Sequence, residues 1–466
     1  LSNNRSELDF NNLGFTSGNI SEDYELNNLV FNWDITPDMT LISATSYQER
    51  SATSPTDVSG WVPIVETFFP GTTIFAPAFG REITVDQPVE QIGFEFPSLV
   101  ESFNHETRLV GTYNDNIYYT VGFSYKDQDF STDAFSVFFP DPNATGSVAH
   151  AVDATFSTEA LAIFADVSYV INDAWEVTFG ARQYSDDRES DAKGFSFGRV
   201  RDFAGKTDNS ELLFRAVAKW NYADDQMAYL SVAEGFRSGG LQDSETEEAS
   251  GGLVPNFYDP EELITYEIGA KGKLLNGKLR YETAAYIQDY TEIQIVEPVL
   301  ILSAVVNGGE AEIIGFEAAL SYDVTNNLFF NLSYSHNDSE LLHETAQHKK
   351  GEPFDNVPIN DTLSVSADYS FNWAAGVGGH LRVDYFDRDG SVNNIKTGNF
   401  DILNQQHEGV NMLNARLGFL RDEWSFYLYA ENITNEEQQV RKPFRGQIDY
   451  LIQQPRTIGA TLRWKF

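Results

Sequence analysis

The segment "GFSFG" (194–198) is the one stretch of the sequence that matches a catalytic pattern. It fits G-x-S-x-G, in which a strained turn between a strand and a helix exposes the serine, here Ser196, as a hydrolase nucleophile. The residues that follow, "RVRDFAGKTDNS", show no helical pattern and belong to a predicted long loop. Because the mechanism needs the helix, the sequence favours an ordinary loop over a catalytic serine, and we expect no enzyme.

Histidines and carboxylates gather in three other segments. His343 and His348 are five residues apart with Glu344 beside the first, a spacing that does not form a helical ligand pair, and no third histidine is near. The segments "QDSETEEAS" (242–250) and "DYFDRDG" (384–390) could bind a hard divalent cation through oxygen, or bridge through cations to anionic surface lipid. Solvated external loops explain all three segments better than metal binding does, so we predict no metal site and no cofactor.

The segment "EGFRSGG" (234–240) offers a different chemistry, ligand recognition. Arg237 lies where a predicted strand enters a loop, and its guanidinium can bind an anionic chelate in a bidentate manner. The alternative is a structural bend, because Gly239 and Gly240 relieve strand sterics. Aromatic residues of the long loops either contact a ligand or pack on one another: Trp61, Phe68, Phe69, Phe75 and Tyr258. Our candidate ligand contacts are Arg237, Tyr258, Trp61 and Phe69.

Composition limits the possible partners. The formal net charge is -39, from 31 basic and 70 acidic side chains, so nucleic acid is excluded as a partner, because its binding needs clustered Lys and Arg. Aromatic residues make up 14% of the chain, which argues against disorder despite the acidity. The chain has no cysteine, which removes disulfides, thiolate metal sites and cysteine nucleophiles.

Period-two alternation of apolar and polar residues dominates the sequence. In 117–125, for example, Ile117, Tyr119, Val121, Phe123 and Tyr125 alternate with the intervening residues, which is the pattern of a strand with one apolar face. Most predicted strands have ten residues or more, whereas strands average about five or six in soluble proteins. The seventeen predicted strands are 24–34, 39–51, 98–113, 116–127, 157–171, 175–186, 210–222, 226–238, 262–274, 278–296, 310–323, 328–338, 361–371, 378–387, 410–420, 424–439 and 456–466.

The connections between these strands alternate in length. The short ones are turns such as "LNG", in which Asn276-Gly277 is a strong hairpin signal. The long ones run over 52–97, 128–156, 187–209, 239–261, 297–309, 339–360, 388–409 and 440–455. In an up-and-down meander all short turns then lie at one rim and all long loops at the other. No run of about 18 apolar residues exists, and we predict an all-β, antiparallel transmembrane barrel with periplasmic turns and external loops.

Tryptophan supports the membrane interpretation. Trp61 is the only tryptophan in a long loop, and the rest lie near short turns or the last residue. Such a distribution is typical of an aromatic girdle at a membrane interface, although tryptophan is common near strand ends in general. The predicted girdle is Trp33, Trp175, Trp220, Trp373, Trp424, Trp464 and Phe466. The terminal strand, with Phe466, Trp464 and Leu462 on one face, also resembles the signal by which barrels are recognised for insertion.

The opposite face of the strands is polar and partly charged. So many ionisable groups are too costly to bury in a dry core, so they line water or lie under a polar plug. The residues that we assign to this face are Glu282, Gln288, Glu317, Asn331, Ser333, Arg382, Asp384, Asn414, Arg416 and Glu431.

Several segments, in order, resemble TonB-dependent outer-membrane receptors. They are "YLSVAEGFRSGGLQ" (229–242), "YDPEELITYEIGAKGKL" (258–274), "AAYIQDYTEIQI" (284–295), "AEIIGFEAALSYD" (311–323), "NLSYSHND" (331–338), "YAENITNEEQQ" (429–439) and "PRTIGATLRWKF" (455–466). The resemblance implies a 22-stranded barrel around a globular plug. It also implies uptake of a scarce nutrient, an iron–siderophore complex by default, driven by the TonB energy-coupling protein across the outer membrane of a Gram-negative bacterium.

The chain departs from the family in two respects. Seventeen strands are not twenty-two, and no plug precedes them. We therefore expect 1–466 to be an incomplete barrel domain, with 1–23 the tail of an external loop, and about five strands and the plug upstream of Leu1. The first and last strands should then not pair with each other.

Other partners follow from the outer-membrane assignment. We expect contact with outer-membrane lipid and lipopolysaccharide, with the barrel-assembly machinery, with a small-molecule nutrient or metal chelate and, through the missing plug, with TonB. A passive porin-like channel is the alternative function. An outer-membrane enzyme is a third class, for which the sequence offers no credible set of catalytic residues.

Overall fold

The structure is a computed structural model in which strands account for most of the described residues. The description covers residues 21–57, 73–76, 81–84, 93–132, 136–139, 147–148, 150–196, 199–242, 254–299, 302–344, 349–353, 360–374, 376–397, 400–407, 409–437, 439–441 and 451–465. Across these residues, no helix is both long enough and apolar enough to span a membrane.

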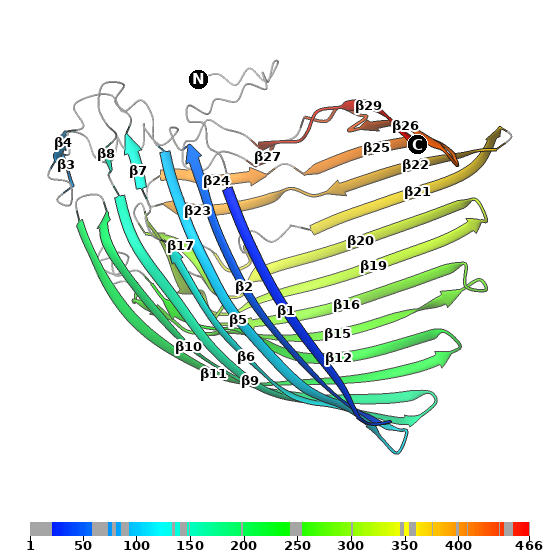
Figure 1. The fold of residues 1–466 in the computed structure, drawn as a ribbon, viewed down its shortest axis with the longest axis horizontal. Helices are drawn as coiled ribbons and strands as arrows, with labels where there is room; N and C mark the ends of the chain where they lie inside the picture. The colour runs from blue at the N-terminus through cyan, green and yellow to red at the C-terminus, as the bar shows by residue number, and fades with distance from the viewer. Residues whose placement is uncertain are drawn as a thin grey trace.

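One large antiparallel sheet dominates the molecule and curves into an incomplete cylinder (Figure 1). The sheet has 19 strands. Two of them are short: β7 (Ser136–Phe139) pairs with the outer end of β5 (Gly93–Tyr113), and β8 (Ser147–Val148) pairs with β7. The other strands each pair with the next long strand of the chain, which confirms the predicted up-and-down topology. These strands are β1 (Ser21–Thr36), β2 (Met39–Asp57), β5 (Gly93–Tyr113), β6 (Ile117–Thr132), β9 (His150–Asn172), β10 (Trp175–Ser196), β11 (Arg199–Ala223), β12 (Gln226–Arg237), β15 (Glu261–Leu274), β16 (Leu279–Thr291), β19 (Ala311–Thr325), β20 (Leu328–Leu341), β21 (Asn360–Ala374), β22 (Val377–Arg388), β25 (Val410–Arg421), β26 (Trp424–Glu431) and β29 (Thr457–Trp464).

The remaining strands form small two-stranded sheets in the long connections. They are β3 (Thr73–Ala76) with β4 (Arg81–Thr84), β13 (Gly240–Leu241) with β14 (Phe257–Tyr258), β17 (Gln294–Val299) with β18 (Leu302–Asn307), β23 (Ser391–Thr397) with β24 (Phe400–His407), and β27 (Gln439–Arg441) with β28 (Leu451–Ile452). None of these hairpins was predicted from the sequence, and most of their strands have six residues or fewer.

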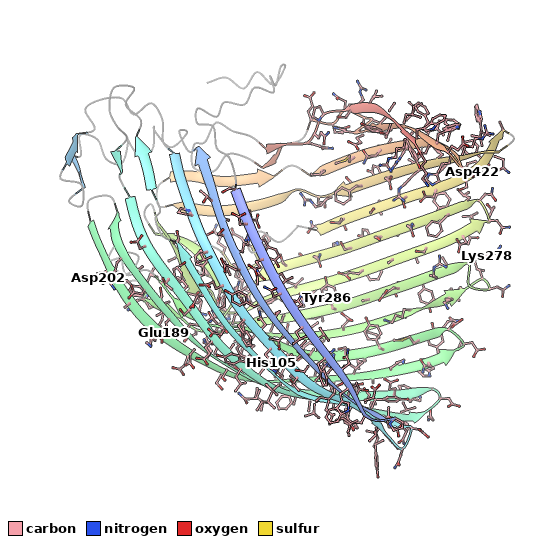
Figure 2. The ribbon with its side chains drawn as sticks, in the orientation of Figure 1. His105, Glu189, Asp202, Lys278, Tyr286 and Asp422 are labelled. Atoms are coloured by element: carbon pink, nitrogen blue, oxygen red, sulfur yellow. The ribbon has the colours of Figure 1, made fainter. Side chains whose placement is uncertain are left out.

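The short turns lie together at one rim, as predicted (Figure 1). Lys278 and Asp422, from two separate turns, both lie at this rim, whereas Glu189 and Asp202 lie toward the opposite end (Figure 2). The turn at Asn276-Gly277 has φ values of 58° and 82°, which is the left-handed conformation that Asn and Gly tolerate best. Turn chemistry therefore fixes one end of the barrel wall.

Several predicted boundaries were wrong, and β2, β5, β6 and β9 extend further than predicted. The predicted loop 187–209 is mostly strand, because β10 and β11 stay paired up to Ser196 and Arg199. Its residues alternate without an apolar face, and the backbone ladder together with the ion pair of Lys206 and Glu189 maintains the hairpin above the apolar band. The predicted strand 278–296 breaks at Glu292, where φ is 53°. The predicted strand 424–439 ends at Glu431, before Asn432 turns the chain with φ of 47°.

The apolar side chains of the long strands are exposed along one face of the sheet. Leu29 is 71% exposed, Phe179 64% and Ile163 59%, values that a soluble protein would avoid in a continuous band. All six described tryptophans of the predicted girdle lie in strands beside the short-turn rim, and Trp175 stacks on Trp220 with ring centroids 5.8 Å apart. Trp61 and Phe466 lie outside the described residues.

The two edges of the sheet are β1 and β29. All sixteen residues of β1 are exposed, and within the described residues β1 pairs only with β2 and β29 only with β26. The first and last strands are therefore not neighbours, as the strand count predicted.

Candidate functional site

The polar side chains lie on the concave side of the sheet, in rows set by the cross-strand register. Ser321 donates to Asn331 at 2.8 Å across the pair β19–β20. Arg382 stands directly opposite Arg416, and the repulsion is relieved because Asp384 and Asp368 bind Arg382 at 2.8 and 3.1 Å while Arg416 lies 3.9 Å from the ring of Tyr427. These contacts place residues that the sequence assigned to the polar face on one common surface.

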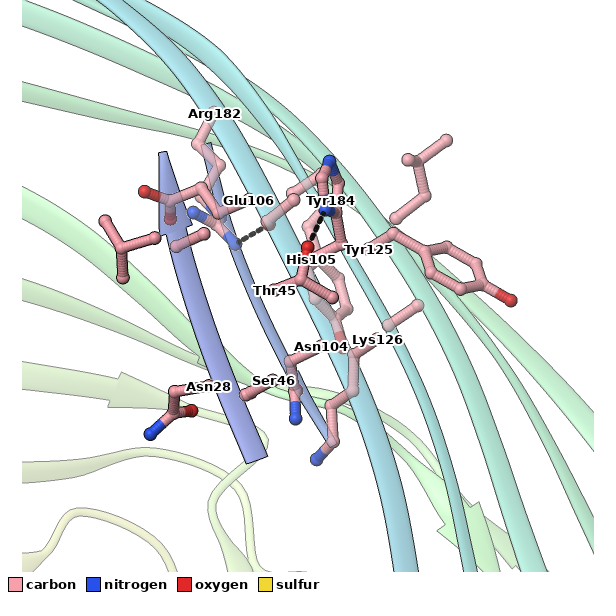
Figure 3. Close-up of a pocket in the computed structure, with 16 residues that line it drawn as sticks. Asn28, Thr45, Ser46, Asn104, His105, Glu106, Tyr125, Lys126, Arg182 and Tyr184 are labelled. Carbon is pink, nitrogen blue, oxygen red and sulfur yellow. Dashed lines mark hydrogen bonds between the residues drawn. The ribbon is translucent and has the colours of Figure 1, made fainter. Parts of the chain in front are cut away.

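A pocket of 500 Å³ opens on this surface over strands β1, β2, β5, β6, β9 and β10 (Figure 3). One row of its wall consists of Asn28, Ser46, Asn104 and Lys126, each directly opposite the next across the strand pairs. In Figure 3 Lys126 and Tyr125 point to opposite sides of the sheet, as strand alternation requires. The pocket wall is thus polar and formed by side chains from well-separated parts of the chain.

The charges in this pocket are unbalanced. The ammonium group of Lys126 makes no hydrogen bond or ion pair with any other described residue. Arg182 donates to the hydroxyl of Ser124 at 3.2 Å, and its guanidinium lies 5.6 Å from the ring centroid of Phe164. The one carboxylate that lines the pocket, Glu106, accepts a hydrogen bond from Arg108 at 3.0 Å.

A second pocket, of 580 Å³, continues along the same wall toward the short-turn rim. It contains Arg108, Phe164, Asp166 and Arg215. Arg215 donates twice to one oxygen of Asp166, at 3.1 and 2.8 Å. Gly180 lies between these two residues in the row, and a Cβ there would overlap the Asp166 carboxylate, so the glycine is what permits the ion pair.

At the long-loop end the connections β12–β15 and β16–β19 are joined by a polar cluster, here called the mouth cluster: Arg237, Asp259, Glu261, Gln294 and Asn307. Arg237 donates to Glu261 at 2.5 Å and to the carbonyl of Gln294 at 2.9 Å. The side-chain amide of Gln294 donates to the carbonyls of Arg237 and Asp259 at 3.3 and 3.0 Å. Asn307 both donates to and accepts from the backbone of Asp259. The mouth cluster therefore fixes the hairpin β17–β18 against the top of β12 and β15.

An adjacent cluster centres on Asp186, whose side chain is fully buried. The carboxylate accepts hydrogen bonds from Asn209 at 2.7 Å, Ser238 at 2.7 Å, Tyr184 at 3.2 Å and Arg188 at 2.9 Å. Asn209 in turn accepts a hydrogen bond from the backbone NH of Gly239. One buried carboxylate thus holds the start of the β12–β15 connection against β10 and β11.

The main apolar core among the described residues lies at the base of the hairpin β17–β18. Ile293, Ile295, Ala311, Ile313 and Leu341 are buried together, with Tyr286, Tyr290 and Val306 packed against them. Polar and apolar contacts together make this part of the mouth a preformed surface.

The structure brings together two of the four candidate ligand contacts. Arg237 and Tyr258 lie at the two ends of the β12–β15 connection, since Tyr258 pairs with Gly240 and Arg237 with Glu261. Trp61 and Phe69 lie outside the described residues. Sequence reasoning missed Lys126 and Asp186: the alternation of each strand places them on the polar face, but nothing in the sequence shows which residues face them.

The other chemical candidates acquire ordinary structural surroundings. Ser196 is the last residue of β10, in a continuous hairpin and not in a strand-to-helix elbow. His343 lies 3.1 Å from Glu310, and His348 and most of 242–250 lie outside the described residues. Asp384 is bound to Arg382. Among the described residues there is no group of His, Cys, Asp or Glu side chains able to hold a metal ion.

Comparisons with known proteins agree on the fold. The family model "TonB dependent receptor-like, beta-barrel" matches residues 1–433. The pesticin receptor of Yersinia pestis is 24% identical over 195 residues, which are 40% of this chain and 28% of that protein. The probable TonB-dependent siderophore receptor PiuA of Acinetobacter baumannii is 24% identical over 213 residues, 45% of this chain and 27% of that protein.

Solved structures cover almost the whole chain. The ferric yersiniabactin uptake receptor FyuA from Yersinia pestis superposes with a TM-score of 0.72 at 14% identity, over 96% of this chain and 62% of that one. The siderophore receptor PiuA from Acinetobacter baumannii gives a TM-score of 0.69 at 14% identity, over 96% of this chain and 64% of that one. The chain thus spans less than two thirds of the length of these structures, and its matches cover under a third of the curated relatives.

Proposed function

We propose, because this chain belongs to the family of TonB-dependent receptor-like β-barrels, that it is the barrel portion of a receptor that imports an iron–siderophore complex. The family is one of outer-membrane proteins of Gram-negative bacteria, and its members are transport receptors. In this proposal the ligand binds from outside at the long-loop end and moves inward with energy supplied through TonB.

The observation that carries the proposal is the match of the family model to residues 1–433. The long strands of the sheet follow one another in an uninterrupted up-and-down order, which agrees with that match. The names of the relatives supply the ligand class, because they include a siderophore receptor and a ferric yersiniabactin uptake receptor. The preformed surface at the long-loop end supports ligand binding there, since ordering loops in advance reduces the entropy cost of binding.

The open edge of β1 motivates a proposal on domain organisation. A strand with unpaired backbone groups on one side is not viable in lipid. We therefore propose that strands of a segment preceding 1–466 pair with β1 and β29, and that a plug in the same segment covers the polar concave side and reaches TonB. The 62% coverage of the FyuA structure is compatible with this division.

Individual residues take roles within this proposal. Arg237 and Tyr258, with Trp61 and Phe69, contact the ligand. Trp33, Trp175, Trp220, Trp373, Trp424, Trp464 and Phe466 form the girdle at the periplasmic interface, in contact with outer-membrane lipid. Lipopolysaccharide surrounds the outer half, and the barrel-assembly machinery inserts the chain.

Uptake of chelated iron tests the function. Cells lacking their own siderophore receptors would carry the full-length parent protein or residues 1–466 only, each with and without the energy-coupling protein. We expect uptake of radioactive ferric siderophore only from the full-length protein and only with energy coupling. Equal uptake by both forms, or uptake indifferent to TonB, would contradict the proposal and favour a passive porin-like channel.

A further inference from the structure

We propose that the concave wall formed by β5, β6, β9, β10 and β11 carries a binding strip for a negatively charged chelate, with Lys126 and Arg182 as its outer contacts and Arg108 and Arg215 as its inner ones. These four residues are called the cationic strip below. The inference rests on the proposed function for the direction of transport, and it adds the charge of the cargo and the wall along which the cargo passes.

The outer part of the cationic strip has two cations without a carboxylate partner. Lys126 makes no hydrogen bond or ion pair with any described residue, and Arg182 is held by the hydroxyl of Ser124 and the aromatic face of Phe164. Both line the same 500 Å³ pocket. A half-buried cation that lacks a counter-ion is costly, and a bound anion would relieve that cost.

The inner part of the cationic strip continues without interruption. Arg182, Phe164, Gly122 and Arg108 form one row across β10, β9, β6 and β5, and the ring of Phe164 fills the space above Gly122. Arg215 lies in the neighbouring row. Arg108 and Arg215 each hold one carboxylate, Glu106 at 3.0 Å and Asp166 at 2.8 Å. Glu211, directly opposite Tyr184, is a third carboxylate on this face of the wall, so four cations face three carboxylates along the strip.

A neighbouring part of the wall has the opposite character. On β15, β16 and β19 the concave face presents Glu267, Glu282 and Glu317, of which Glu267 accepts a hydrogen bond from Tyr229 at 2.6 Å and Glu282 lies 3.8 Å from Lys271. In a chain with a net charge of -39, the cationic strip is a local exception. An anionic cargo is therefore repelled from the acidic wall and guided to the cationic strip.

Guanidinium and ammonium groups select the chemistry of the cargo. They bind carboxylate, catecholate and other anionic oxygens through charge-assisted hydrogen bonds, and the carboxylates already bound to Arg108 and Arg215 can be exchanged for those of a passing chelate. The alternative occupant of this pocket is a protein segment inside the barrel whose acidic side chains pair with the cationic strip. Such a segment would neutralise the strip permanently, and transport would then not depend on the charge of the cargo.

Uptake by the full-length receptor separates these occupants. The probes are a panel of ferric chelates of negative, zero and positive net charge. For the imported chelate we expect a negative charge, and we expect Lys126→Gln and Arg182→Gln each to raise its KM about tenfold. Lys126→Arg should restore transport, and Lys193→Gln, whose lysine pairs with Asp191 on the other face, is the matched control and should change nothing. Import of neutral or cationic chelates only, or of an anionic chelate unaffected by both Gln variants, would overturn the proposal.

Direct anion binding distinguishes failure of this inference from failure of the proposed function. Purified full-length protein is dialysed against radioactive citrate, a trianion that needs no transport. We expect citrate to bind and to be lost in the double variant of Lys126→Gln and Arg182→Gln, whether or not any chelate is imported. Absence of citrate binding to the unmodified protein, with the barrel shown to be folded by its heat-dependent gel mobility, refutes the cationic strip even if iron uptake is intact.

Discussion

The ring of Tyr286 on β16 covers Gly315, the residue directly opposite it on β19, and the Tyr286 hydroxyl donates to Asn337 on the next strand at 2.5 Å. A Cβ at Gly315 would overlap the ring. One tyrosine therefore joins three strands on the concave side. The same arrangement of an aromatic ring over a directly opposite glycine recurs at Tyr229–Gly269, Tyr119–Gly111, Tyr427–Gly418 and Tyr429–Gly459.

The first prediction concerns this pair. Gly315→Ala should destabilise the barrel by about 1–3 kcal/mol, because the added methyl group displaces the ring and breaks its hydrogen bond to Asn337. The measurement is the temperature at which the protein loses its compact gel mobility. Gly235→Ala is the control, because a Cβ at Gly235 has open space around it. An equal effect at both glycines would show that strand propensity, and not the ring, determines the result.

Much of this architecture was predictable from the sequence because period-two alternation and turn chemistry are local signals. All seventeen long strands were found, and Asn276-Gly277 marked its turn correctly. The outer ends of β10 and β11 were missed because their pairing lies beyond the apolar band, where alternation of apolar and polar residues no longer reports on strand structure.

The site was less predictable, for a physical reason. Lys126 and Arg182 are separated by 56 positions, and they share a pocket only because β6 and β10 lie on either side of β9. The buried state of Asp186 depends on Asn209 and Ser238 in the same way. Such side chains look like any other polar residues of a strand until the register is known.

The second prediction concerns Asp186. Asp186→Ala should leave Asn209, Ser238 and Arg188 without their acceptor, at a cost of about 1–3 kcal/mol for each buried group left unsatisfied. We expect faster amide hydrogen exchange in 238–242, measured by mass spectrometry. Asp187→Ala changes the next residue, which is exposed on the other face, and should leave that exchange unchanged. Equal exchange in the two variants would contradict the role of Asp186.

The third prediction tests the lipid-facing band. Phe179→Arg places a charge where the side chain is 64% exposed on the apolar face, and should cost about 2–4 kcal/mol of folding free energy in a bilayer. Denaturant titration of protein refolded in phospholipid vesicles measures this cost. Asp187→Arg, on the same strand and face, stands between Glu159 and Asp208 and should be tolerated. If Phe179→Arg and Asp187→Arg lower the folding free energy by the same amount, β10 does not cross lipid at Phe179.

The fourth prediction tests the girdle. In a Trp61→Phe background, the remaining tryptophans are Trp33, Trp175, Trp220, Trp373, Trp424 and Trp464, all near one rim. Lipid-attached quenchers near the headgroups should therefore quench fluorescence more strongly than quenchers near the ends of the acyl chains, because tryptophan prefers the interface. Stronger quenching from the bilayer centre would disprove the girdle assignment.

The last prediction separates two roles of Arg237, a structural one and a ligand-binding one. The Glu261 side chain is only 11% exposed and relies on Arg237 as its cation. Both Arg237→Gln and Glu261→Gln remove this ion pair, so both should loosen the hairpin β17–β18 and speed its hydrogen exchange to a similar extent. If Arg237 also contacts an anionic ligand, only Arg237→Gln removes that contact, and its affinity for the imported chelate should fall about tenfold below that of Glu261→Gln. The two affinities come from fluorescence titration of the purified receptor. Equal affinities, with equally loosened hairpins, would restrict Arg237 to holding the mouth cluster together.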